Sequence, residues 1–110
     1  MHLDQFTERA FAVHALYDEL NLRDQGRTWT REEFMLGLIG DVGDLAKLAM
    51  AAEGAREAPG DPDALGHELA DCLWAVLVLA GLHDVDLAAE FRRMTDDLEH
   101  TLTARLNHQN

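Results

Sequence analysis

Apolar residues recur at helical spacing along almost the whole chain, and this pattern constrains the fold more than any other feature. Phe6, Ala10 and Val13, for example, are three or four residues apart and therefore share one face of a helix. The pattern breaks at turn-forming residues, and both prolines of the chain fall in one break, at residues 58–62. No segment alternates as a β-strand does. We therefore expect an all-α protein.

Two of the expected helix starts carry recognisable caps. The Thr30 hydroxyl can accept a hydrogen bond from the Glu33 amide while the Glu33 side chain reaches back, which is a capping box. Asp86 is suited to be the N-cap of the last helix. Four helices with short connections favour a bundle, built as one domain over residues 1–110. The expected helices cover residues 4–22, 30–53, 63–82 and 87–106, with residues 107–110 frayed.

Composition excludes several classes of protein. The chain has 110 residues and 47% hydrophobic content, too apolar for disorder and small enough for oligomerisation to enlarge its buried core. A net charge of −12 argues against nucleic-acid binding.

The single cysteine, Cys72, cannot form an internal disulfide, and the N-terminus lacks a signal-peptide pattern. The longest apolar run, residues 72–82, is shorter than the roughly 20 residues that span a bilayer. We expect a cytoplasmic protein that binds no membrane.

Two short acidic pairs interrupt otherwise apolar helical segments: Asp41-x-x-Asp44 and Glu68-x-x-Asp71. A spacing of three places both members of a pair on one helical face, with Cβ atoms roughly 5–6 Å apart. Buried carboxylates need a partner or lose their charge. A single pair of this kind usually lies on a solvated face, but the second pair runs directly into a wholly apolar stretch. If the two helices face each other, the four acids converge and need a cation.

The donor types indicate which cation. Carboxylate oxygens without cysteine or neighbouring histidine ligands suit Mg²⁺, with Mn²⁺ possible, better than Zn²⁺. A di-iron bundle would use Glu-x-x-His pairs, and the sequence has none; the nearest substitute is a single Asp97-x-x-His100. The sequence therefore predicts a magnesium site at Asp41, Asp44 and the second acidic pair.

The segments around the acids resemble a known family. GLIGDVGDLAK at residues 37–47 and ELADCL at residues 68–73 resemble the MazG-like, all-α nucleoside triphosphate pyrophosphohydrolases, most closely the dCTP pyrophosphatase branch. GLHDVDL at residues 81–87 is similar to that family's turn into its last helix. The resemblance covers roughly residues 28–94. It implies a four-helix subunit that assembles into a homodimer or homotetramer.

By this resemblance, Asp41, Asp44, Glu68 and Asp71 would bind Mg²⁺, which holds the triphosphate of a nucleotide substrate. A metal-activated water would attack at the α–β linkage and release a nucleoside monophosphate and pyrophosphate. One carboxylate accepts the proton of that water. Asp44 and Glu68 are the two candidates for this role, and the sequence does not choose between them.

Four further residues are candidates for substrate binding. Lys47, the only lysine of the chain, lies one turn beyond Asp44, where it either contacts a phosphate or is solvated at the surface. Trp29 either stacks on a nucleobase or caps the bundle, and Arg27 lies beside it where the family gathers base-contacting residues. Arg93 stands in for a lysine in the family's late phosphate-binding element.

Two departures from the family pattern leave a second function open. The first acidic pair is Asp-x-x-Asp where the family has Glu-x-x-Glu, so each carboxylate is one methylene shorter. The late Lys-x-x-x-Asn-x-x-Arg element is missing, and the corresponding positions are Arg93, Asp97 and His100. The alternative is a catalytically inactive helical protein that kept the scaffold and serves as an interaction module.

Overall fold

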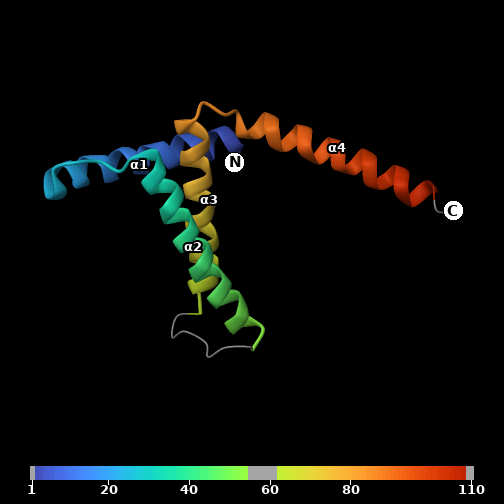
Figure 1. The fold of residues 1–110 in the computed structure, drawn as a ribbon, viewed down its shortest axis with the longest axis horizontal. Coiled ribbons are helices and arrows are strands. Elements are labelled where there is room, and N and C mark those ends of the chain that lie inside the picture. The colour runs from blue at the N-terminus through green and yellow to red at the C-terminus, as the bar shows by residue number, and fades with distance from the viewer. Residues whose placement is uncertain (1, 55–61, 109–110) are drawn as a thin grey trace.

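The computed structural model describes residues 2–54 and 62–108, which form four α-helices and contain no β-strand. The expectation of an all-α chain is thus confirmed. Helices α2 and α3 run side by side, α1 crosses one end of this pair, and α4 projects away from the other three (Figure 1). The chain is elongated, with extents of 63 × 40 × 26 Å. The helices are α1, Leu3–Gln25; α2, Arg31–Ala52; α3, Ala64–Leu82; and α4, Leu87–His108.

The core lies where α1, α2 and α3 meet. Val78 of α3 is fully buried, and Leu77 is 3% exposed. Ala10 of α1 and Phe34 of α2 complete this buried cluster. The Trp74 indole N–H donates to the Ala10 carbonyl oxygen at 3.1 Å, which satisfies the indole and ties α1 to α3. Helix α3 is therefore the central element of the chain, because both other core helices pack on it.

The start of α2 has the predicted capping box. The Glu33 amide donates to the Thr30 hydroxyl at 3.2 Å, and the Thr30 amide donates to a Glu33 carboxylate oxygen at 3.0 Å. Arg27 donates twice to the same carboxylate, at 2.6 and 2.8 Å. These hydrogen bonds, led by that from Arg27, lower the pKa of Glu33 to about 2. Arg31 donates to the Leu82 carbonyl oxygen at 3.4 Å and so joins the start of α2 to the end of α3.

The connection from α3 to α4 is short and internally hydrogen-bonded. The Asp84 amide donates to the Gly81 carbonyl oxygen at 3.2 Å and the Val85 amide donates to that of Ala80 at 2.8 Å, the two bonds of a Schellman motif. Asp84 occupies the left-handed position, with φ of 56°. Asp86 then accepts from the Ala89 amide at 3.1 Å, so the predicted N-cap is confirmed.

Several element boundaries differ from the sequence expectation. Helix α1 continues to Gln25 and ends where Gly26 takes a left-handed φ of 75°. The end of α3 at Leu82 is as expected, and Gly81 in its last turn leaves room for the Phe11 ring, which packs directly where a Cβ would stand. The predicted fraying at residues 107–108 is wrong, since α4 extends to His108. Residues 109–110 and most of the expected loop at 54–62 lie outside the described residues.

The expected bundle is not closed within one chain. Helices α1, α2 and α3 share a core, whereas α4 leaves it directly after Leu87 (Figure 1). The Schellman motif ends α3 and turns the chain there, and α4 then leaves at a steep angle to α3 (Figure 1).

Helix α3 is apolar and long enough to cross a membrane, judged by length and composition alone. The run at residues 72–82, on which the sequence prediction rests, is only part of this helix. Both α1 and α2 pack on α3, which carries Glu68 and Asp71 in its first half, but only 17% of its apolar window is buried within one chain. The cellular location remains a prediction.

Candidate functional site

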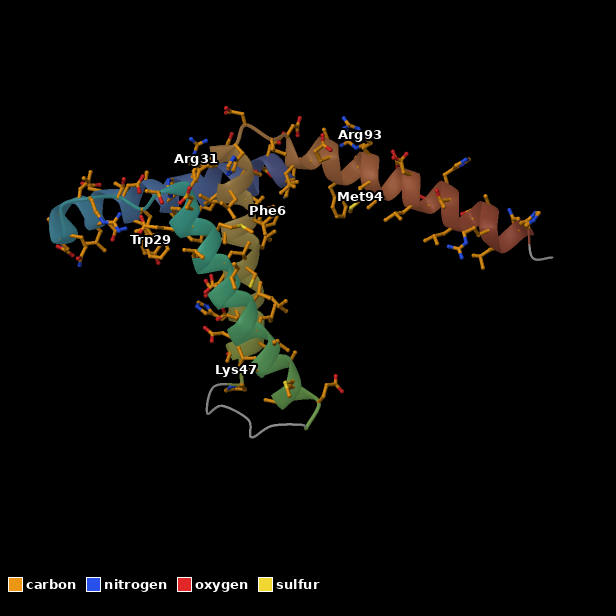
Figure 2. All side chains as sticks on the ribbon, in the orientation of Figure 1. Phe6, Trp29, Arg31, Lys47, Arg93 and Met94 are labelled. Atoms are coloured by element: carbon orange, nitrogen blue, oxygen red, sulfur yellow. The ribbon has the colours of Figure 1, made fainter. Side chains whose placement is uncertain are left out.

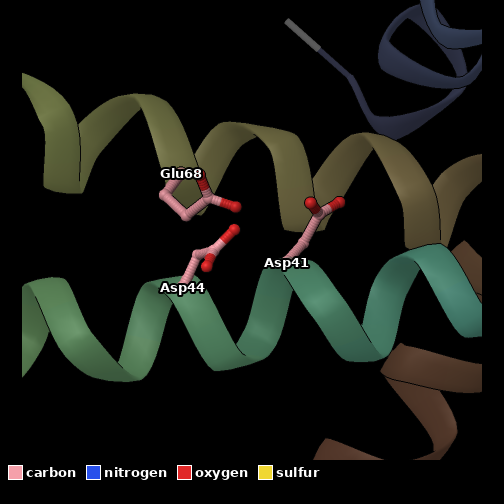
Figure 3. A group of neighbouring side chains, drawn as sticks. All are labelled: Asp41, Asp44 and Glu68. Atoms are coloured by element: carbon pink, nitrogen blue, oxygen red, sulfur yellow. The ribbon is translucent and has the colours of Figure 1, made fainter.

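The acidic residues meet where α2 faces α3. Asp41 and Asp44 come from α2 and Glu68 from α3, and their side chains point into the space between the two helices (Figure 3). One carboxylate oxygen from each of the three lies within 4.8 Å of the others. The antiparallel course of α2 and α3 produces this meeting, since it places the two motifs at the same height along the pair. Three carboxylates at this separation can share one cation.

Asp71, the fourth predicted ligand, lies at the edge of this group. Its carboxylate is 3.5 Å from Nε2 of His67, one turn earlier on α3. It remains close enough for its charge to raise the pKa values of Asp41 and Glu68. The structure thus brings three of the four predicted ligands together and holds the fourth beside them.

The surroundings of Asp41 and Glu68 disfavour the negatively charged form of both carboxyl groups. Burial, followed by the charges of Asp71 and Asp44, raises the pKa of Asp41. Burial also raises the pKa of Glu68, with further contributions from the three aspartates and an opposing one from His67. Both shifts mean that negative charge is disfavoured here, and a bound cation would offset that cost.

One oxygen of the site has no hydrogen-bonding partner. Glu68 Oε1 is buried and unpaired among the residues that the structure describes. An unpaired buried acceptor is costly, so it points to an unseen donor or cation. Cys72, next along α3 from Asp71, is a poor alternative ligand because burial and the nearby acids raise the pKa of its thiol. The donors are therefore carboxylate oxygens, which fit Mg²⁺ or Mn²⁺.

An aromatic pocket of about 300 Å³ adjoins the acidic group. Gly37 in its wall lies one helical turn before Asp41 on α2. Ala75 in its wall lies one turn after Asp71 on α3. A ligand in this pocket could therefore extend into the acidic group. The pocket is lined by Tyr17, Asp18, Asn21, Trp29, Phe34, Gly37, Trp74 and Ala75.

Trp29 forms part of the pocket wall and also packs locally. Its ring lies so close over Gly37 that a Cβ there would be 3.1 Å from the indole. It makes an edge-to-face contact with Phe34, with ring centroids 5.6 Å apart. Trp29 is nevertheless 48% exposed, so it keeps surface for a ligand (Figure 2). Glycine at position 37 is explained by this close approach.

The three basic candidates are placed differently. Lys47 is exposed on α2, one turn beyond Asp44 and toward the end of α2 remote from α1 (Figure 2). Arg27 is engaged by Glu33 at the start of α2. Arg93 lies on the projecting α4, paired with Glu90 at 3.0 Å (Figure 2). Within one chain, Lys47 is the basic candidate nearest the acids, and Arg93 is not brought to them.

Sequence reasoning missed the contribution of α1 to the pocket. Tyr17, Asp18 and Asn21 are not among the candidates that the sequence indicates, yet all three line the cavity. Trp74, whose indole donates to the Ala10 carbonyl oxygen, also forms part of the pocket wall. The available signal was weak: Tyr17 and Asn21 are one turn apart at the border of an apolar face, which many surface positions share.

Comparisons with family models, with curated proteins and with solved structures found no match to this chain.

Proposed function

We propose that this chain is a Mg²⁺-dependent nucleoside triphosphate pyrophosphohydrolase that releases a nucleoside monophosphate and pyrophosphate. The observation that carries the proposal is the meeting of Asp41, Asp44 and Glu68 across two helices, with a buried unpaired oxygen on Glu68. The resemblance of the two acidic segments to the MazG-like family supports it independently.

The proposed roles of the acidic residues are supported by their meeting between α2 and α3. Asp41, Asp44 and Glu68 would hold Mg²⁺, with Asp71 as a neighbouring fourth carboxylate. Bound Mg²⁺ supplies charge neutralisation for the polyphosphate and orients it for substitution at phosphorus. This requirement is strict for a chain of net charge −12, which otherwise repels a triphosphate.

The aromatic pocket is the proposed nucleoside site. The exposed faces of Trp29 and Tyr17 offer stacking surface for a base. Asp18 and Asn21 offer acceptors and donors for its polar edge or for the sugar. A base held there would direct its phosphates along the α2–α3 interface toward Asp41.

Proton transfer requires a carboxylate that accepts the water proton as the P–O bond of the α–β linkage breaks. Glu68, which lies across from Asp44 in the space between the two helices, is one candidate. Asp44, the most exposed of the three meeting carboxylates, is the other candidate. Lys47, exposed and one turn from Asp44, is the proposed contact for a phosphate oxygen.

The test is pyrophosphate release from a panel of nucleoside triphosphates with Mg²⁺ or Mn²⁺. We expect Glu68→Gln to lower kcat by at least about 100-fold, the usual loss when a general base or ligand is removed. Glu99→Gln, on the exposed surface of α4, is the matched control and should keep the wild-type rate. Equal rates for wild type and Glu68→Gln would remove catalysis from this site.

A non-catalytic helical interaction protein is the second candidate. Two observations favour it: the shortened Asp-x-x-Asp pair, and the position of Arg93 on α4, where it pairs with Glu90. This alternative predicts no pyrophosphate release with any nucleotide of the panel and no stabilisation by Mg²⁺.

A further inference from the structure

The aromatic pocket beside the acidic group combines electron-rich rings with a single carboxylate. Among the described residues that line it, Asp18 alone carries a charge, and none carries a positive one. The cavity measures about 300 Å³, which is at the small end of the range for small-molecule sites. It therefore has room for one flat ring system of the size of a nucleobase, and its walls can select the chemistry of that ring.

Four aromatic rings form a continuous series in the pocket wall. The ring centroid of Tyr17 lies 5.6 Å from that of Trp74, which lies 5.8 Å from that of Phe34. The Phe34 centroid in turn lies 5.6 Å from that of Trp29. Tyr17 is 51% exposed and Trp29 is 48% exposed, so both keep free surface for a ligand. Because aromatic faces attract cations, and indole most strongly, this series favours a ligand that is flat and positively charged.

Asp18 supplies the charge that complements such a ligand. Its Oδ2 lies 3.3 Å from Nε2 of His14, one turn earlier on α1, and this contact fixes the orientation of the carboxylate. The His14 side chain is only 12% exposed, so it holds Asp18 from the inner side of α1. Oδ1 has no partner among the described residues, which leaves one carboxylate oxygen for a ligand.

Alkylation of a ring nitrogen changes what a carboxylate meets at the edge of a base. Unmodified cytosine and adenine present an amino donor beside a ring-nitrogen acceptor, and an ionised carboxylate, which can only accept, is repelled by that acceptor. Methylation at N3 of cytosine or N1 of adenine removes the acceptor and leaves the ring positively charged at neutral pH. The amino group then donates a charge-assisted hydrogen bond, roughly twice as strong as a neutral one.

We propose that the aromatic pocket selects nucleotides whose base is a cation because a ring nitrogen is alkylated. The substrate class of the chain is then alkylation-damaged nucleoside triphosphates. This inference rests on the proposed function, because the acidic group has to hold the phosphates of the same molecule. The net charge of −12 acts in the same direction, since it attracts a cationic base.

The first test measures the binding of nucleosides, which carry no phosphate and need no metal. Quenching of tryptophan fluorescence by 3-methylcytidine and by 1-methyladenosine at pH 7 is compared with quenching by cytidine and by adenosine. We expect each methylated nucleoside to bind at least about 10-fold more tightly than its parent, because only the cation gains both the ring faces and the charged hydrogen bond. Equal affinities, or tighter binding of the parents, would overturn the inference.

Two substitutions in the pocket test which side chains cause the preference. Asp18→Asn keeps the shape of the side chain and removes its charge, so the preference should fall below about threefold. Trp29→Leu removes an indole face and should weaken binding of the methylated nucleosides more than binding of their parents. Glu19→Gln, the matched control, removes the same charge from the next, exposed position of α1 and should keep the full preference. Circular dichroism of each variant checks folding, and a preference that survives both pocket substitutions would overturn the inference.

The second test separates this inference from the proposed function. With Mg²⁺, kcat/KM for pyrophosphate release should be at least about 10-fold higher for 3-methylcytidine triphosphate than for cytidine triphosphate. Equal values for the two would contradict the inference and leave the proposed function in place. Failure to hydrolyse any triphosphate would contradict the proposed function, and the substrate class with it, even if the nucleosides bind selectively.

Discussion

Helices α2 and α4 have the same length, 22 residues, yet their sequences produce opposite outcomes. Helix α2 separates polar from apolar residues poorly, and Asp41 and Asp44 lie where it faces α3. Helix α4 separates them cleanly and remains uncovered. In this chain, polar residues inside a helix–helix contact indicate a candidate functional site. A continuous exposed apolar stripe indicates that a partner is needed but does not identify that partner.

The largest expected difference between the two regions is in stability. Phe34→Ala removes a ring that is 6% exposed and contacts His14, Trp29 and Trp74, so it should lower the free energy of unfolding by about 3–5 kcal/mol. This loss should be independent of protein concentration. Leu98→Ala on α4 should change stability by less than about 0.5 kcal/mol in dilute protein. Chemical denaturation followed by circular dichroism measures both.

Concentration sharpens this comparison. If a second copy covers the exposed apolar residues of α4 in the homodimer that the family resemblance implies, the Leu98→Ala deficit should grow as protein concentration rises. A deficit that stays constant from dilute to concentrated protein would contradict that view of α4.

The next largest expected effect is stabilisation by Mg²⁺, which should depend on the acidic site between α2 and α3 and not on the acids of α4. Mg²⁺ at about 100 times its dissociation constant should stabilise the wild type by about 2.7 kcal/mol, because only the folded chain assembles the three carboxylates. Asp41→Asn should abolish most of this gain. In EDTA the same variant should melt at a higher temperature than the wild type, because it removes repulsion with Asp71 and Asp44.

Asp97→Asn is the matched control on α4 and should keep the full response to Mg²⁺. A wild-type melting temperature that does not change with Mg²⁺ would argue against the metal site and for the non-catalytic alternative. Calorimetric scans of each variant measure the melting temperature with Mg²⁺ and the melting temperature with EDTA.

The smallest expected effect is the pH dependence of stability that arises from Glu33 at the start of α2. The pKa of Glu33 is lowered to about 2 in the folded chain from an ordinary 4.5, so the folded state binds fewer protons than the unfolded state between these values. Its stabilising contribution is therefore complete above pH 4.5 and is lost as pH falls toward 2. Glu33→Gln should lower stability at pH 7 and flatten this part of the acid-unfolding profile.

Thr30→Ala provides the control for that profile. It removes the hydroxyl acceptor of the capping box but leaves the ion pair of Arg27 with Glu33, at 2.6 Å. We expect a loss of about 1 kcal/mol, with the acid dependence retained. If the two variants give the same profile, the ion pair does not set the pKa of Glu33.

Much of the fold could be predicted from local sequence because its signals act over one helical turn. The capping box at Thr30 and the N-cap at Asp86 involve neighbours in the chain, and both are confirmed. The reason for glycine at position 81 could not be predicted locally, because it depends on Phe11, a residue of another helix. The pocket wall from α1 was missed for the same reason, since nothing around Tyr17 indicates which cavity it lines.

The sequence by itself determined that the chain is helical, where its helices begin, and that acids interrupt two apolar segments, because helical period and capping are short-range properties. The tertiary structure decided that Asp41, Asp44 and Glu68 meet while Asp71 stands aside. It also decided that the aromatic pocket adjoins them and that α4 leaves the core. These outcomes depend on which helix faces share one limited core, and that choice is made by packing between residues far apart in the chain.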